Sequence, residues 1–352
     1  MKNVSPRVSD SELTATYQSY LHHNKSVKAT AETMGMERST IKNRLKNYET
    51  MVAKNPASAL EFPDFPPEGY PIAKIIETMK ERSSLRRNSY DAHTWFPVKV
   101  TENKPIGLML FGDPHVDDDG CDWTLLSSHI EVCKQPGVYG INIGDTTNAW
   151  AGRLVKKYAN QETSAKTAGK LAEWFMLDAG IKWLVFLLGN HDQWGDQPSV
   201  LAQMAKRYGT KGLTLHDWEA RFSLNFPNGR KINIWTAHDF PGDSMWNPGH
   251  GLIKAARFGK DVDLLVCGHK HNWSLSQWEL ADKGTTPTMI RVRGYKFNDD
   301  YARKIGKTEQ REGASMLVVI DPNAKTEAGR LTSFVDVEAG AEYLQYLRLK
   351  KP

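Results

Sequence analysis

Short apolar runs that each end in polar side chains dominate the chain from Pro105 onward. Five runs have the length of a strand, at 106–111, 138–143, 183–188, 231–237 and 262–267. Each is followed by aspartate, asparagine or histidine, and helical stretches separate several of them. This alternation predicts an α/β domain over residues 105–352. Because ligands bind at the carboxyl ends of strands in such domains, we expect these polar residues to form one site.

The side chains at the strand ends are oxygen and nitrogen donors without a thiolate. Glycine precedes the first donor in four of the five runs and lets the backbone turn sharply. A single histidine or glycine–aspartate pair is more often a buried polar residue or a turn, but five repetitions favour a metal site. The donors suit Mn²⁺, Fe, Zn²⁺ or Mg²⁺. Seven ligands exceed one ion's needs, so we expect two ions: Asp113, His115, Asp145, Asn190, His238, His269 and His271.

The order of these blocks resembles the signature of calcineurin-like metallophosphoesterases over residues 106–271. The resemblance implies a four-layer αββα sandwich, with two sheets face to face and helices outside. It also implies hydrolysis of a phosphoester at two divalent ions, for which Mn²⁺ is the first choice. The blocks are Asp113-Pro-His115, Gly144-Asp145, Gly189-Asn190-His191-Asp192, His238 and Gly268-His269-Lys270-His271.

The resemblance implies a role for each site residue. His191 would bind no metal but would contact the phosphate and protonate the leaving oxygen, and Asp192 would orient it. Asp145 would bridge the two ions. The first ion would be held by Asp113, His115 and His271, and the second by Asn190, His238 and His269.

Two details favour a nuclease or small phosphodiesterase over a Ser/Thr protein phosphatase. Asp192 stands where phosphatases usually carry glutamate, and no Asp-Arg-Gly follows Asp145. The third block is similar to that of SbcD-type DNA repair nucleases and small phosphodiesterases. Those nucleases usually carry histidine at the position of Asn148, which we expect to hydrogen-bond a phosphate oxygen.

Tryptophans and basic residues follow the metal blocks. The tryptophans either stack a base or wall the site from solvent: Trp150, Trp194, Trp246 and Trp273. The basic residues either follow a nucleic-acid backbone or form a solvated helix face: Arg153, Lys156, Lys157, Lys166 and Lys170. Residues 117–119 are expected to be a solvated loop or helix cap, and the run at 315–322 a closing strand of the second sheet. Structural or surface roles are expected for His129, His216 and His250.

Residues 1–50 have the pattern of a helix-turn-helix that resembles transposase- and resolvase-type DNA-binding domains. Ala31 is placed for close helix packing, Gly35 for the turn, and Ile41 and Leu45 for the apolar face of the second helix. Ser39 is expected to cap that helix. The alternative is a small bundle used for oligomerisation. The residues expected to face DNA are Arg38, Ser39, Lys42, Asn43, Arg44 and Lys46.

The remaining segment, residues 51–104, is predicted to be a linker, because residues 55–71 are dense in proline. A short helix is predicted over 72–87. The net charge of +5 is compatible with nucleic acid, and three cysteines without metal spacing fit a reducing compartment. With no long apolar run, we expect a cytoplasmic protein without a membrane segment.

These features together predict a DNA phosphodiesterase that its N-terminal domain delivers to duplex, a pairing that would suit a phage or mobile element. One alternative is a phosphomonoesterase, protein phosphatase or small-molecule phosphodiesterase whose N-terminal bundle binds a partner. Another is a DNA-binding regulator with a decayed site, which is disfavoured because no ligand position is missing.

Overall fold

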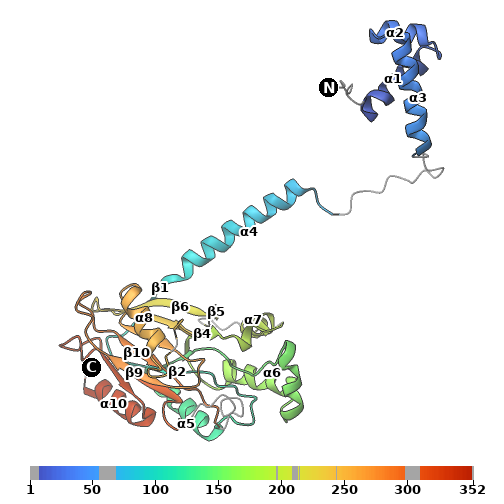
Figure 1. Ribbon diagram of the computed structural model, residues 1–352. Helices are drawn as coiled ribbons and strands as arrows, with labels where there is room; N and C mark the ends of the chain where they lie inside the picture. Colours follow the sequence, from blue (N-terminus) through green and yellow to red (C-terminus); the bar gives the residue numbers. More distant parts are fainter. Residues whose placement is uncertain are drawn as a thin grey trace. The chain divides into compact units, whose positions relative to one another are not determined.

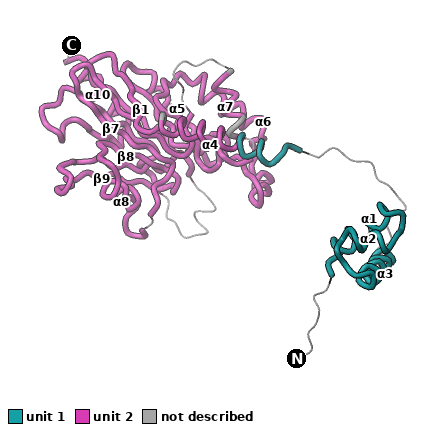
Figure 2. Tube along the Cα trace, turned by 90° about the horizontal axis from the view of Figure 1, so that it is seen from above, with its two compact units in different colours: residues 1–78 teal, residues 79–352 magenta. Residues whose placement is uncertain are grey.

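The computed structural model describes residues 8–54, 69–195, 197–207, 213, 215–242, 244–297 and 310–350. The chain divides into two compact units, residues 1–78 and 79–352, which Figure 2 colours separately. Each unit buries apolar residues of its own. The proline-dense stretch of the predicted linker lies almost entirely outside the described residues.

The described residues of the first unit form three complete helices, α1 (Asp10–His22), α2 (Val27–Met34) and α3 (Arg38–Lys54), and the beginning of a fourth. Their core includes Leu13, Ala31 and Ile41, none more than 6% exposed. Gly35 ends α2 in the left-handed conformation with φ +61°, which a glycine adopts without strain. The predicted positions of Ala31, Gly35 and Ile41 are therefore confirmed.

Helix α4 (Ile72–His93) begins where predicted but continues past Arg87. Strand β1 (Thr94–Lys99) follows it and pairs in parallel with β6 (Glu219–Asn225). Phe96 and Val98 of β1 pack against a core cluster that both sheets share. The interpretation of 51–104 as a linker is therefore wrong for β1, because these side chains are part of a sheet.

The described residues of the second unit form two six-stranded sheets, both with parallel and antiparallel pairs. The orders are β1-β6-β7-β8-β10-β9 in the first sheet and β12-β11-β2-β3-β4-β5 in the second. Strands β2 to β5 run parallel, as do β7 and β8. The bounds are β2 (Ile106–Phe111), β3 (Val138–Asn142), β4 (Trp183–Leu188), β5 (Leu215–Asp217), β7 (Lys231–Ala237), β8 (Leu264–Cys267), β9 (Ser274–Gln277), β10 (Thr288–Arg291), β11 (Ser315–Ile320) and β12 (Leu331–Phe334).

The apolar runs are continuous because the central strands are buried on both faces. In β2, Leu108 and Leu110 join a cluster that includes Phe222 of the first sheet. Met109 and Phe111 belong instead to a cluster with helices. A strand covered on both faces needs no polar alternation, which explains the uninterrupted pattern.

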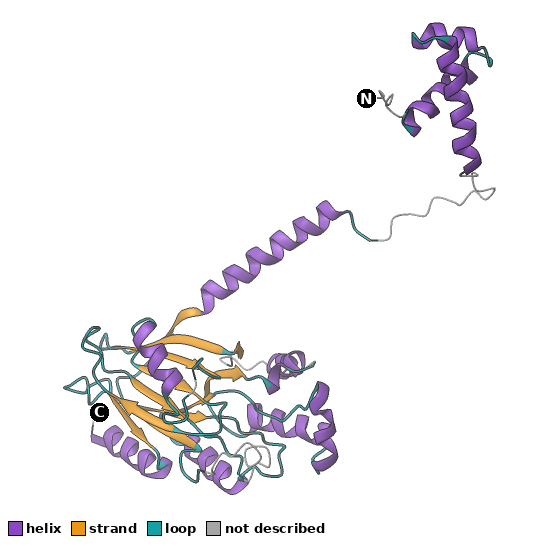
Figure 3. Ribbon diagram, viewed as in Figure 1, coloured by secondary structure: helices purple, strands orange, loops and turns teal. Residues whose placement is uncertain are grey.

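Helices cover the faces of the sheets that do not share this core, and Figures 1 and 3 show them around the strands. The second sheet packs with α5 (Trp123–Cys133), α6 (Ala165–Glu173) and α10 (Val337–Lys350). The first sheet packs with α8 (His250–Phe258). The remaining helical segments among the described residues are η1 (Gly152–Asn160), η2 (Trp174–Asp178), η3 (His191–Gln193) and α7 (Gln197–Arg207).

Strand β11 differs from its predicted closing position. It lies between β12 and β2 and pairs with β2 along all six residues. It is interior rather than at an edge because β12 and β2 flank it, and every residue of the strand is buried. In the part of the chain that the structure describes, no helix combines the length and apolar character needed to cross a membrane.

Candidate metal centre

The predicted ligands come from the carboxyl ends of strands in both sheets. The loops after β2, β3 and β4 supply those up to Asn190, and the loops after β7 and β8 supply the histidines beyond it. Residues from these loops form three overlapping triads, and within each triad the potential ligand atoms all lie within 4.8 Å of one another. The triads are Asp113, His115 and His271; His115, Asp145 and His191; and Asp145, His238 and His269.

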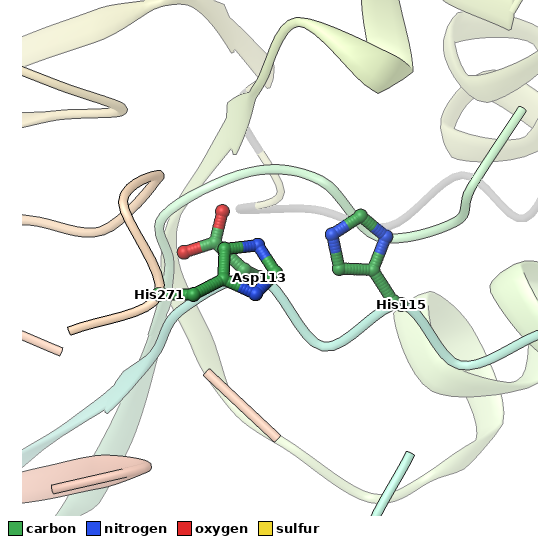
Figure 4. Close-up of side chains that lie close together, drawn as sticks. All are labelled: Asp113, His115 and His271. Atoms are coloured by element: carbon green, nitrogen blue, oxygen red, sulfur yellow. The ribbon is translucent and has the colours of Figure 1, made fainter. Parts of the chain in front are cut away.

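The first triad, shown in Figure 4, contains buried atoms that lack ordinary partners. Asp113 is fully buried and His115 is 2% exposed. Neither Oδ1 of Asp113 nor Nδ1 of His115 has a hydrogen-bond partner among the described residues. Leaving such atoms buried and unpaired costs free energy. A divalent cation would accept electron pairs from both atoms, so these residues fit a metal ion.

His238 organises the other side of the centre. Its Nδ1 donates to the carbonyl oxygen of Ile143 at 2.9 Å. Its Nε2 therefore faces Oδ1 of Asn190 at 2.9 Å, Nδ1 of His269 at 3.0 Å and Oδ2 of Asp145 at 3.3 Å. In a neutral imidazole this Nε2 would carry a lone pair, directed at other lone pairs. The arrangement needs a proton or a metal ion at its middle.

The pKa values follow from burial and from the charges packed together here. Burial, with a smaller effect of the Asp145 charge, raises the pKa of Asp113 to about 7. Burial disfavours ionisation of Asp145 too, but His238 and His191 outweigh it and hold its pKa below the usual range. Burial would lower the pKa of His238, yet Asp145 and Asp113 raise it to about 9. A proton on His238 thus supplies the positive charge that the cluster of donors requires.

The backbone at the ligands is strained. Among the described residues, ten other than glycine have positive φ, and five of these are predicted ligands. Positive φ is uncommon for residues other than glycine, although aspartate and histidine adopt it more often than most, and it clusters at functional sites. The five are Asp113 (φ 41°), His115 (φ 40°), Asp145 (φ 54°), His269 (φ 69°) and His271 (φ 49°).

Glycine is required before the donors because neighbouring loops approach the backbone closely at these positions. A Cβ on Gly189 would lie 2.6 Å from the backbone N of Asp145 and 2.7 Å from Cε1 of His238. A Cβ on Gly268 would collide with the Asp113 carboxylate. The loops from the two sheets therefore touch directly through residues without side chains.

Asp192 does not orient His191, contrary to the expectation. Its Oδ1 accepts from the backbone N of Thr146 and its Oδ2 from the backbone N of Gly189, both at 3.0 Å. Because both carboxylate oxygens are used in this way, Asp192 fixes the loops after β3 and β4. Nδ1 of His191 donates instead to the backbone carbonyl of Asn148.

Both hydrogens of the Asn148 side-chain amide are used within the protein, which contradicts the predicted hydrogen bond from this amide to a phosphate. Its Nδ2 donates to Oδ2 of Asp118 at 2.8 Å and to Oε1 of Gln161 at 3.1 Å. Residues 117–119 form a loop as expected, and Asp119 is exposed, but the expectation of a solvated position is wrong for Asp117. Asp117 is 1% exposed and accepts from the backbone N of Asn148 at 2.7 Å.

Two of the four tryptophans lie against His191. The ring centroids of Trp150 and Trp194 are 5.3 and 4.1 Å from that of His191. Trp246 is 89% exposed, whereas Trp273 packs against the core between the sheets. Of the basic residues, Lys157 places its ammonium 4.4 Å from the ring centre of Trp150.

The other basic residues and the three remaining histidines have simpler environments. Surface positions are found for Arg153, Lys156, Lys166 and Lys170. His129 is buried against Tyr295, His216 is buried and stacks on Phe96, and His250 is exposed. These histidines take the structural and surface roles that were predicted.

Gln161 and the structural role of Arg291 were missed by the sequence reasoning. Arg291 is fully buried, lies 3.0 Å from Oδ1 of Asp239 and donates to the carbonyl of Gly268. It thereby joins the loops after β7 and β8. Neither residue belongs to a ligand block, so no local signal marks it.

The exposed face of α3 carries most of the predicted DNA contacts, but two expectations are wrong. The Arg44 side chain is only 13% exposed, because it lies 3.5 Å from Glu12 and from Thr16 of α1. Ser39 lies within the first turn of α3 and donates to Glu37, so it does not cap the helix. The exposed residues are Arg38, Ser39, Lys42, Asn43 and Lys46.

A family model described as the PucR C-terminal helix-turn-helix domain matches residues 13–62. The match confirms a helix-turn-helix region, of the PucR type rather than the transposase or resolvase type that the sequence resembles. Because such domains bind DNA, it supports DNA as a partner. No curated protein matches the chain.

Proposed function

We propose that residues 79–352 form a metallophosphoesterase-type αββα sandwich that hydrolyses phosphodiesters in DNA with two divalent ions. The observation that carries the proposal is the convergence of donors from five strand ends, in two sheets, into overlapping triads. Buried, unpaired ligand atoms and strained ligand backbones support the same conclusion. An ordinary core would not combine these costs without a bound cation.

The ions would divide between the two sides of the centre, with Asp145 shared. Mn²⁺ is the proposed metal, with Fe, Zn²⁺ and Mg²⁺ as alternatives. When bound, the ions would supply Lewis acidity toward the phosphoryl oxygens and the attacking water. One side comprises Asp113, His115 and His271, and the other Asn190, His238 and His269.

His191 is proposed to protonate the leaving oxygen. Its Nδ1 is held by the carbonyl of Asn148, so its Nε2 is the atom free to move a proton. That Nε2 lies 3.9 Å from Oδ2 of Asp145, beside the metal centre. The imidazole is therefore placed to act on a phosphoester bound there.

The helix-turn-helix is proposed to deliver the enzyme to DNA. The exposed face of α3 presents Arg38, Lys42 and Lys46, which can neutralise phosphates, and Asn43, which can reach a base edge. Binding by this unit would raise the local concentration of DNA for the catalytic unit without adding a contact to the metal centre.

The first experiment incubates the full-length protein with Mn²⁺ and end-labelled single- and double-stranded DNA. We expect the wild type to cleave, Asp145→Ala to lose metal and activity together, and His191→Ala to keep its metal but lose rate. Elemental analysis measures the metal. Hydrolysis of a chromogenic phosphoester without DNA cleavage would move the assignment to a phosphatase or small-molecule phosphodiesterase. Metal binding without hydrolysis of either substrate would refute the proposed phosphoesterase activity.

The delivery hypothesis has a separate test in the full-length chain. Replacing Lys42 and Lys46 by alanine is expected to weaken DNA cleavage and leave chromogenic turnover unchanged. Lys325→Ala, at an exposed position in the other unit, is the matched control. Equal DNA cleavage by the double variant and the control would refute delivery by α3.

A further inference from the structure

We propose that Gln161 is a positioning residue for His191 and acts through Asn148 and Trp150. The proposal rests on the proposed phosphoesterase function for its catalytic consequence. Gln161 lies between η1 and α6, outside every ligand block. Its importance follows only from the contacts of its side chain.

The Gln161 carboxamide joins three segments of the chain. Its Oε1 accepts from Nε1 of Trp150 at 2.8 Å and from Nδ2 of Asn148 at 3.1 Å. Its Nε2 donates to the backbone carbonyl of Asp117 at 3.0 Å and to Oδ2 of the same residue at 3.1 Å. The other carboxylate oxygen of Asp117 accepts from the backbone N of Asn148 at 2.7 Å. Asn148 is thus held through both its side chain and its backbone.

This network determines the surroundings of the His191 ring. The carbonyl of Asn148 accepts from Nδ1 of His191, and the indole of Trp150 lies edge-on at a centroid distance of 5.3 Å. Gln161 holds both neighbours at once. If it moved, the ring of His191 would lose the carbonyl that fixes its orientation and the wall that limits its rotation.

The network requires the donor and acceptor of a carboxamide at position 161. Glutamate would face the Asp117 carboxylate with a second negative charge and would remove the donor. Alanine would leave the indole N–H of Trp150 and an amide N–H of Asn148 without their acceptor. Both replacements therefore release the segment that carries the Asn148 carbonyl.

The test uses Gln161→Ala and Gln161→Glu, with Glu162→Ala as a control at the exposed neighbouring position. Turnover is measured on two phosphoesters, one with a nitrophenolate and one with an alkoxide leaving group. Only the alkoxide needs a proton from His191, so its kcat should fall about 10-fold or more while the nitrophenyl ester changes little. KM and metal content should match the control, whereas the unfolding temperature should fall because buried groups lose their hydrogen-bond partner. Equal losses on both esters, or no loss, would overturn the proposal.

A second readout does not depend on turnover. In zinc-loaded protein labelled with ¹⁵N-histidine, the Nδ1–H resonance of His191 is identified by its absence in His191→Ala. We expect Gln161→Ala to shift or broaden this resonance and Glu162→Ala to leave it unchanged. An unchanged resonance in Gln161→Ala would overturn the positioning role. A shifted resonance in a protein that hydrolyses neither ester would retain the positioning role and refute the phosphoesterase function.

Discussion

Replacing Gly189 by alanine is expected to force apart the loops that bring the two sheets together at the metal centre. The added Cβ would lie 2.6 Å from the backbone N of Asp145 and 2.7 Å from Cε1 of His238, and closer still to the Asp145 carboxylate. A backbone atom cannot rotate away as the end of a side chain can. The loop after β4 must therefore move relative to the loops after β3 and β7.

The size of the effect follows from these distances. Ordinary contact begins near 3.4 Å, so the loops must separate by roughly 0.8 Å in a close-packed region. Overpacking of this kind costs about 1–3 kcal/mol, which corresponds to a fall of about 2–5 °C in Tm for a domain of this size. A displacement near 1 Å at reacting groups can also lower the rate about 100-fold.

Calorimetry and elemental analysis of the purified variant measure these effects. Gly169→Ala is the matched control, because a Cβ at this position of α6 would meet nothing within 4 Å. That control is expected to gain about 0.5–1 kcal/mol, since alanine favours a helix more than glycine does. If Gly189→Ala bound metal like the wild type and unfolded at the same temperature, the argument from close approach would be refuted.

Three further predictions concern metal, DNA and pH. Chelation should lower the unfolding temperature, because an ion at 100 times its Kd stabilises the fold by about 2.7 kcal/mol; an unchanged transition in calorimetry would contradict bound metal. Lys42→Ala should weaken DNA binding and reduce the salt dependence of binding by about one phosphate contact, whereas Arg44→Ala should mainly destabilise the first unit. Fluorescence anisotropy at several salt concentrations measures the first effect, and thermal unfolding measures the second. The reverse pattern would contradict the packing of Arg44 against α1. Burial lowers the pKa of His129 to about 4, so between pH 6.5 and 4 the unfolded chain binds a proton that the folded chain does not, and the free energy of unfolding should fall by at most about 3 kcal/mol. Denaturant unfolding of His129→Asn should show a smaller dependence of this free energy on pH over that window. An equal pH dependence would contradict burial as the cause.

The strand ends of the candidate site could be predicted because their signal is local. An apolar run, a glycine and a polar residue lie within one short stretch, and the period of the run indicates a buried strand. The helix-turn-helix could be predicted for a similar reason. Gly35 and the buried Ala31 and Ile41 are separated by only a few residues, within a single compact motif.

The errors concern partners that lie far away along the chain. Asp192 bonds to the backbone of Thr146, 46 positions earlier, and Arg44 meets Glu12, 32 positions earlier. No periodicity reports such pairings. A buried carboxylate such as Asp117 is also unusual, because burial normally excludes charged groups unless they are paired. Its role became visible only once Gln161 was placed beside it.

The left-handed backbone at the ligands has a consequence for how this protein would respond to selection. Glycine adopts that conformation without strain, so glycine at these positions would relieve strain in the metal-free fold. Laboratory evolution for heat resistance in the presence of a chelator would therefore erode Asp113, His115, Asp145, His269 and His271 early. Retention of all five in a thermostabilised lineage would require a simultaneous demand for activity. Substitution or retention of these five residues would therefore show whether a lineage was selected for stability of the fold or for catalytic activity.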